Sequence, residues 1–169
     1  KKIDQQDLFK KKGMQLIDAN QYKEAIKEFD KAIELTPDDP EGWMFRGQSK
    51  FCLDQFEEAI KDFDKALELT PDYSESLFFR GLSKLALEQY DEAFKDFDKA
   101  IENNPQVSKW WRLRGEYKYP LEQYEEAIKD FDKAIEINPD FHPSWNASGQ
   151  SKYFLHQYEE AIKDFDKAI

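Results

Sequence analysis

The sequence predicts an all-α protein, a solenoid built from five antiparallel helix-turn-helix repeats. The first observation is a fixed period of 34 residues, as from Gly13 to Gly47. Three series keep this period: Gly13, Gly47, Gly81, Gly115 and Gly149; Ala25, Ala59, Ala93, Ala127 and Ala161; Phe29, Phe63, Phe97, Phe131 and Phe165. The second observation is helical spacing inside each period. Such a period is typical of stacked repeats rather than of a globular domain with one active site.

Each repeat is predicted to contain two helices. In the stretch from Trp43 to Pro71, small and large residues alternate at spacings of three, four and seven. A tight turn at Leu53 to Gln55 separates the two runs, and Pro71 pushes Thr70 out of the helical region and ends the second helix. The expected repeats are 6–39, 40–73, 74–107, 108–141 and a truncated 142–169, within a single continuous solenoid domain, 1–169.

The repeated glycine needs a packing reason, because a glycine inside a helix costs ~1 kcal/mol relative to alanine. We predict that the two helices of a repeat cross closely, with Gly47 facing Ala59. Pro120 marks the fourth repeat as irregular, since its ring would collide with the carbonyl of Glu116. The first helix of that repeat should therefore end about a turn early and change the local groove width.

The chain resembles the tetratricopeptide repeat family, as a fragment of a bacterial-type protein with several such repeats. The residues that carry the resemblance in the second repeat are Trp43, Gly47, Phe56, Ala59, Phe63, Ala66 and Pro71, and four further sets match them. The departures are few, such as Leu77 in place of an aromatic residue. The resemblance implies a right-handed superhelical α-solenoid whose first helices line a concave face and whose second helices form the convex back.

Composition restricts the classes of partner. The net charge of -11 disfavours binding to nucleic acid or an anionic membrane, which require a basic surface. Charged residues make up 36% of the chain, mean hydropathy is -0.90, and no apolar run approaches the ~18 residues of a membrane span. We therefore expect partners to be proteins, with no membrane insertion. A cytoplasmic location is the default, although targeting signals could lie outside these residues.

No catalytic residue, metal site or cofactor is predicted, and we do not expect an enzyme. Cys52 is the single cysteine, and His142 and His156 have no metal-ligand spacing. The carboxylates of Asp62 and Asp64 point about 200° apart on a helix and cannot share a calcium ion. Neither a Ser/His/Asp set nor a phosphate-binding loop is present in the sequence.

Three arginines each precede the glycine of their repeat, and each repeat also supplies an acidic residue on its second helix. We predict the ion pairs Arg46 with Asp62, Arg80 with Asp96, and Arg114 with Asp130. The fifth repeat has Ser148 opposite Asp164 and should lack the pair. Contact of these arginines with a ligand remains the alternative.

Differences between the repeats indicate where a ligand would bind. The ten residues 57–66 recur unchanged at 125–134 and 159–168, whereas the first helices differ widely outside the scaffold positions. The predicted peptide-binding groove consists of Lys10, Met14, Met44, Gln48, Phe51, Phe78, Leu82, Leu85, Arg112, Glu116, Tyr119, Asn146, Gln150 and Tyr153. Its apolar middle favours an apolar or amphipathic segment, and Lys10 and Arg112 favour an acidic flank. Aromatic residues at several of these positions are also common as scaffold in the family, but Met44 and Leu82 are expected to face the groove.

One familiar activity of the family is disfavoured. The carboxylate clamp for acidic chaperone tails needs basic residues and asparagines at five places. These places are occupied by Lys10, Met14, Phe45, Glu75 and Phe79. Since only Lys10 fits, a chaperone-tail clamp is not expected.

Two functional classes follow. The first is a scaffold that binds a peptide or helix of a partner protein in the concave groove. The second is a structural or regulatory array of a larger protein that acts through end-to-end stacking or self-association. The chain stops at Ile169 inside a second helix with no polar capping helix, so we expect either a fragment of a longer protein or an end buried by another copy.

Overall fold

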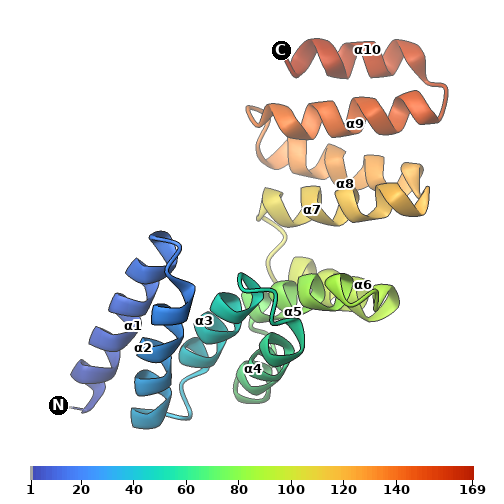
Figure 1. Cartoon of the computed structure of the whole chain (residues 1–169). Coiled ribbons are helices and arrows are strands. Elements are labelled where there is room, and N and C mark those ends of the chain that lie inside the picture. The colour runs from blue at the N-terminus through green and yellow to red at the C-terminus, as the bar shows by residue number, and fades with distance from the viewer. Residues whose placement is uncertain (1) are drawn as a thin grey trace. The chain divides into compact units, whose positions relative to one another are not determined.

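The computed structural model describes residues 2–169, and this part of the chain contains ten α-helices, one short 3-10 helix and no strand (Figure 1). The all-α prediction is confirmed. The α-helices are α1 (Lys2–Asp18), α2 (Tyr22–Leu35), α3 (Pro40–Phe51), α4 (Phe56–Leu69), α5 (Ser74–Ala86), α6 (Tyr90–Asn103), α7 (Ser108–Lys118), α8 (Tyr124–Ile137), α9 (His142–Phe154) and α10 (Tyr158–Lys167), and the 3-10 helix is η1 (Tyr119–Leu121).

The helices pack in consecutive pairs, and each pair corresponds to one predicted repeat. Two compact units result: unit 1, Lys1–Asn103, contains α1 to α6, and unit 2, Asn104–Ile169, contains α7 to α10. Within unit 1, α2 packs on α3 and α4 on α5, and within unit 2, α8 packs on α9. The single continuous solenoid over 1–169 stays a prediction.

Phenylalanines and alanines of the second helices form the core. Phe29, Phe63, Phe97 and Phe131 are almost completely buried. The close helix crossing is confirmed, since a Cβ placed on Gly47 would lie 2.7 Å from a ring carbon of Phe63. The nearest neighbour of this position is the ring of Phe63 rather than the predicted Ala59, although in the third repeat the carbonyl of the equivalent alanine, Ala93, also lies close, at 3.1 Å. The contact with the phenylalanine ring recurs in every repeat.

The turn inside each repeat places a residue other than glycine in the left-handed region. These residues are Asn20, Asp54, Glu88, Glu122 and His156, with φ between 58° and 60°. In the second repeat, Asp54 N–H donates to Phe51 and Gln55 N–H donates to Lys50, both at 3.0 Å. This pair of hydrogen bonds is the Schellman motif, which satisfies carbonyls at a helix end. The predicted tight turn is thereby confirmed.

Three of the proline stops anchor the first helix that follows them. The backbone of Thr70 is extended directly before Pro71, as predicted. The indole N–H of Trp43 donates to the carbonyl of Pro37 at 2.9 Å, and Trp111 and Trp145 make the same bond to the preceding proline. Leu77 has no indole N–H, so the third repeat lacks this hydrogen bond.

Pro120 does shorten the first helix of the fourth repeat. Helix α7 ends at Lys118 and continues as the 3-10 helix Tyr119–Leu121, whereas α5 and α9 end at Ala86 and Phe154. The loss is therefore one or two residues rather than a full turn. The reason is that Gln123 N–H still reaches the carbonyl of Lys118, which restores the usual turn. The change in groove width stays a prediction.

Candidate functional site

In unit 1, several predicted groove residues lie under neighbouring helices. Met44 is 4% exposed, Phe78 is 2% exposed and Leu85 is 8% exposed. The expectation that Met44 faces an open groove is wrong, because its helix, α3, is in contact with both α1 and α5. Phe78 packs on Phe97 with ring centroids 5.0 Å apart and therefore belongs to the core.

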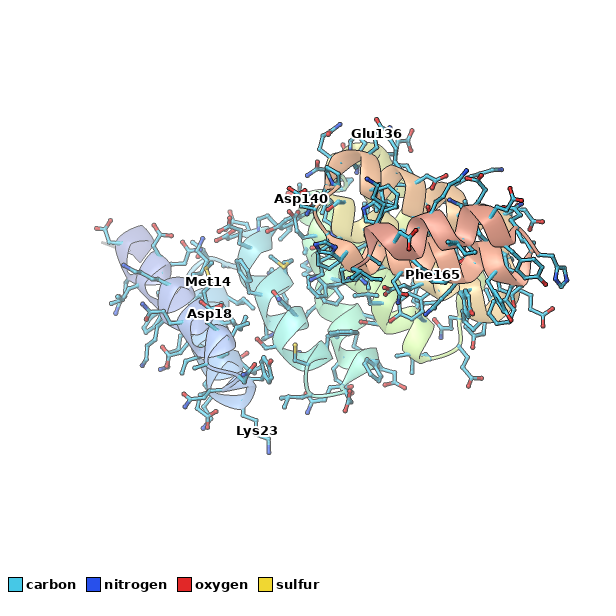
Figure 2. All side chains as sticks on the ribbon, turned by 90° about the horizontal axis from the view of Figure 1, so that it is seen from above. Met14, Asp18, Lys23, Glu136, Asp140 and Phe165 are labelled. Carbon is cyan, nitrogen blue, oxygen red and sulfur yellow. The ribbon has the colours of Figure 1, made fainter. Side chains whose placement is uncertain are left out.

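The remaining groove positions of unit 1 are more accessible. Met14 on α1 is exposed (Figure 2), while Gln48, Phe51 and Leu82 are half-buried. Phe51 lies against Phe56 and Phe79 through edge-to-face ring contacts. Unit 1 thus offers scattered apolar atoms rather than the continuous apolar trough that the sequence predicts.

Lys10 already forms ion pairs with carboxylates of its own chain. Its ammonium group lies 2.8 Å from Asp39 and 2.7 Å from Glu41. Burial disfavours the charged form, but the hydrogen bonds to these two carboxylates outweigh it and raise the pKa of Lys10. An acidic peptide flank would have to displace both intramolecular partners, so Lys10 is a poor anchor for such a flank.

In unit 2, the predicted groove residues gather around one cleft between α7 and α9. This cleft of about 240 Å³ is lined by Glu116, Tyr119, Phe131, Pro143, Asn146, Ala147 and Gln150. Four of these residues belong to the predicted groove: Glu116, Tyr119, Asn146 and Gln150. The first-helix surface therefore forms a defined cleft in unit 2.

Arg112 lines a second cleft and contacts a residue of the first one. Its guanidinium forms an ion pair with Glu116 and lies over the ring of Phe141, 5.3 Å from the centroid. Its Nε atom is buried without a hydrogen-bond acceptor among the described residues. A cleft of about 290 Å³ adjoins Arg112 and Phe141, with Ser108, Lys109, Asn138 and Ser144 as further lining. The arginine is thus held in place by its own unit.

Aromatic rings continue from the cleft to the turns of unit 2. Tyr119 contacts Tyr124 and Phe154, and Tyr153 contacts Phe154 and Tyr158, with centroids 5.3 to 5.8 Å apart. Tyr153, Phe154 and Tyr158 are about half exposed. Burial raises the pKa of the Tyr119 hydroxyl, and the nearby Tyr124 adds to the effect. Sequence reasoning missed Phe154, although Tyr153 and Tyr158 on the two sides of its turn gave a signal.

The predicted arginine pairs are confirmed and are more extensive than expected. Arg46 donates from Nε and Nη2 to Asp62 at 2.9 and 2.6 Å, and from Nη1 to Asp30 of the preceding repeat at 2.7 Å. Arg80 bridges Asp96 and Asp64 in the same way. We call this arrangement, one arginine between two aspartates of successive repeats, an arginine bridge.

The other members of the series fit the same scheme. Arg114 binds Asp130 through Nε and Nη2. A lysine one turn later also contacts the buried aspartate, as Lys50 does with Asp62. In the fifth repeat, Asp164 is paired with Lys152 at 2.6 Å and no arginine is present at Ser148, as predicted. Because Arg46 and Arg80 are fully engaged, they are not free to bind a ligand.

The single cysteine and the two histidines show no arrangement typical of a catalytic or metal site. Cys52 is exposed. His142 Nδ1 lies 3.1 Å from the carbonyl of Lys167, and His156 Nδ1 lies 2.7 Å from the hydroxyl of Tyr158. Within residues 2–169, no three potential metal-ligating side chains form a group, and no helix combines the length and apolar character needed to cross a bilayer.

Comparison with solved structures identifies the fold. MamA from Desulfovibrio magneticus has a TM-score of 0.83 and 21% identity, covering 98% of this chain and 93% of that chain. YrrB, described as a TPR protein with an unusual peptide-binding site, has a TM-score of 0.74 and 22% identity, covering 95% and 83%. PilF from Pseudomonas aeruginosa has a TM-score of 0.90 and 16% identity, covering 99% and 76%. Because the sequence identities are this low, the similarity to these three structures shows the fold alone.

Family models agree with the repeat structure, whereas no curated protein sequence matches the chain. The model described as anaphase-promoting complex, cyclosome, subunit 3 matches residues 18–100. Two tetratricopeptide repeat models match residues 80–140 and 142–169, which together make up more than half of the chain. With its helix pairs and its period, the chain belongs to the tetratricopeptide repeat family.

Proposed function

We propose that this protein is a protein-interaction scaffold that binds a peptide or helical segment of a partner protein in the cleft between α7 and α9. The observation that carries the proposal is the gathering of Glu116, Tyr119, Asn146 and Gln150 around one cleft. The tetratricopeptide fold supports a role in protein interaction in general. Met14, Gln48, Phe51 and Leu82, the more accessible groove residues of unit 1, are proposed as secondary contacts.

The chemistry of the cleft suits a peptide better than a small molecule. Its volume of about 240 Å³ is below the range of ligand pockets, and it would hold one bulky side chain. The amides of Asn146 and Gln150 can donate to and accept from the main chain of an extended segment. The ring of Tyr119 offers apolar surface and a polar hydroxyl. We therefore expect a partner segment with one large apolar side chain.

A peptide-display selection against the intact chain tests this proposal. Selected peptides should lose affinity about fivefold or more for an Asn146→Ala/Gln150→Ala variant, since each removed hydrogen bond contributes ~1 kcal/mol. Gln55→Ala is the control, because Gln55 is an exposed glutamine in the turn before α4 and lies outside the predicted groove. Failure to select any peptide, or equal binding by all three proteins, would reject the cleft as the binding site.

A second candidate function is self-association through α9 and α10. Phe29 and Phe63 stack on Phe45 and Phe79 of the following repeat, with centroids 5.7 and 6.1 Å apart. The equivalent Phe165 on α10 (Figure 2) instead borders an open cleft of about 430 Å³, together with His142, Pro143, Asn146, Ala168 and Ile169. Such a face could receive the helices of another copy.

Sedimentation over a range of concentrations tests self-association. The proposal expects a mass that rises with concentration and falls back to the monomer in an Ala168→Glu variant, whose carboxylate would be placed in the contact. Ala19→Glu, an exposed alanine at a turn of unit 1, is the matched control. A monomer at every concentration would exclude this second function.

A further inference from the structure

The arginine bridges provide a template inside the chain for binding a guanidinium group. In the second repeat, the guanidinium of Arg46 has three kinds of neighbour: the buried Asp62, the half-exposed Asp30 and the ring of Trp43, whose centroid is 4.8 Å away. In the fourth repeat, Arg114 lies 4.9 Å from the ring centroid of Trp111 and binds Asp130. Two carboxylates and an indole face thus form the environment of the arginine.

The fifth repeat keeps this environment but not the arginine. Trp145 occupies the place of Trp43, Asp164 that of Asp62, and Asp132 that of Asp30. Asp164 is 5% exposed, whereas Asp132 lies at the surface. The arginine position holds Ser148. We call Ser148, Trp145, Asp132 and Asp164 the Ser148 site.

Two further observations indicate that the Ser148 site lacks a partner. The hydroxyl of Ser148 is completely buried and has no hydrogen-bond partner among the described residues. Because Ser148 stands at the position of Arg46, its side chain starts toward the same two carboxylates. Buried polar groups normally have a partner, so this hydroxyl is an exception.

The charges at the site are also unbalanced. Around Arg46, the two carboxylates of Asp30 and Asp62 are matched by the arginine and by Lys50. At the Ser148 site, Lys152 is the one cation that faces Asp132 and Asp164 among the residues that the structure describes. Burial raises the pKa of the Asp132 carboxyl, with Lys152 opposing and the neighbouring charge of Asp164 adding to the rise. One positive charge is missing relative to the earlier repeats.

We propose that the Ser148 site binds the guanidinium group of an arginine presented by a partner protein. Guanidinium is favoured over ammonium because its planar fork can bind two carboxylates and stack on an indole at the same time. A metal ion is disfavoured, since hard cations such as Ca²⁺ take six or more oxygen ligands. The exposed Asp132 gives the partner side chain a route from solvent.

This site is separate from the cleft between α7 and α9. Asn146 and Gln150 line the cleft, whereas Trp145, Ser148 and Lys152 follow one another at helical spacing on another side of α9. The inference therefore goes beyond the proposed function and does not depend on it. A partner could use both surfaces of α9, with a large apolar residue in the cleft and an arginine at the Ser148 site.

Nuclear magnetic resonance of the tryptophan indole N–H groups tests the proposal with the intact chain. The probe is Nα-acetyl-arginine amide, titrated at constant ionic strength. The Trp145 signal should shift saturably with a roughly millimolar Kd, as expected for a single side chain. The signals of Trp43 and Trp111 should stay in place, because their rings already face arginines of the chain. The lysine analogue should bind about tenfold more weakly.

Two variants of the Ser148 site test whether the shift of the Trp145 signal comes from binding at this site. Ser148→Arg should abolish the Trp145 shift, because the chain then supplies its own guanidinium, and Asp132→Asn should weaken binding even if Ser148→Arg folds poorly. Asp166→Asn, which changes the residue at the repeat position of Asp132 but on α10, should bind the probe as the original chain does. A Trp145 signal that does not shift, an equal response to the lysine analogue, or an unchanged response in Ser148→Arg and Asp132→Asn would overturn the proposal.

Discussion

Units 1 and 2 have closely similar second helices but different first-helix surfaces. In unit 1, the predicted groove residues Met44, Phe78 and Leu85 are buried, so a ligand would find little of the predicted groove accessible. In unit 2, most of the predicted groove residues are polar, a cleft lies between α7 and α9, and Tyr153 is 54% exposed. The type of side chain at a few first-helix positions therefore decides whether that surface is buried against neighbouring helices or remains accessible to a partner.

The largest expected effect concerns the helix crossing in the two units. Gly81→Leu should destabilise unit 1 by ~1–3 kcal/mol or more, because the new side chain meets the fully buried ring of Phe97 and the carbonyl of Ala93. Gly149→Leu in unit 2 should cost less, since Phe165 is only half-buried and its ring can move. Urea denaturation of both variants measures the difference, and equal losses would mean that the ring of Phe165 is as confined as that of Phe97.

The second prediction compares the arginine position of the third and fifth repeats. Arg80→Met should cost about 2–3 kcal/mol, because it leaves Asp96, which is 7% exposed, with Lys84 as its remaining cation. Ser148→Ala at the equivalent position should be neutral within ~0.5 kcal/mol, because it removes a hydroxyl that has no partner. Thermal and chemical denaturation test both changes. A loss of stability in Ser148→Ala would show that the hydroxyl has a partner in solution.

The third prediction uses the pH dependence of unit 2. The folded-state pKa of Asp132 is raised, so folding favours its protonated form, and the stabilising contribution present at low pH is lost as pH rises through the folded pKa. Asp132→Asn should therefore raise stability at pH 7, with a gain that shrinks as pH falls through the ordinary range of a carboxyl group.

Asp64→Asn is the matched control in unit 1, because Asp64 is paired with Arg80 at 2.7 Å. That change removes an ion pair, whereas Asp132→Asn removes a charge that burial disfavours, so Asp64→Asn should lower stability slightly at pH 7. Denaturation midpoints measured between pH 3 and pH 7 give both profiles. A gain for Asp132→Asn that does not depend on pH would contradict the electrostatic explanation.

The helices, the repeats and the arginine pairs could be predicted from sequence because each rests on local spacing repeated many times. The exposure of the individual groove residues could not be predicted in this way. Met44 and Leu82 look alike in a pattern of letters, yet Met44 is buried and Leu82 half-buried, because burial depends on how neighbouring helices approach. The partner of Gly47 was also missed, since the sequence does not show that the Phe63 ring turns toward the crossing. The Ser148 site became evident once Asp30 was found to share the guanidinium of Arg46.

The smallest expected effect compares the turns that follow α5 and η1. Glu88 and Glu122 have φ of 60° and 58°, a region that costs a residue with a side chain about 1–2 kcal/mol. Glycine removes this cost but loses about 0.5–1 kcal/mol of backbone entropy on folding. Glu88→Gly and Glu122→Gly should therefore each stabilise the chain by up to about 0.5 kcal/mol. Since the hydrogen bonds of the two turns are alike, the gains should be equal despite Pro120. A clearly larger gain for Glu122→Gly in denaturation experiments would mean that the proline strains the turn of unit 2, and that the irregular fourth repeat differs from unit 1 in its backbone as well as in its surface.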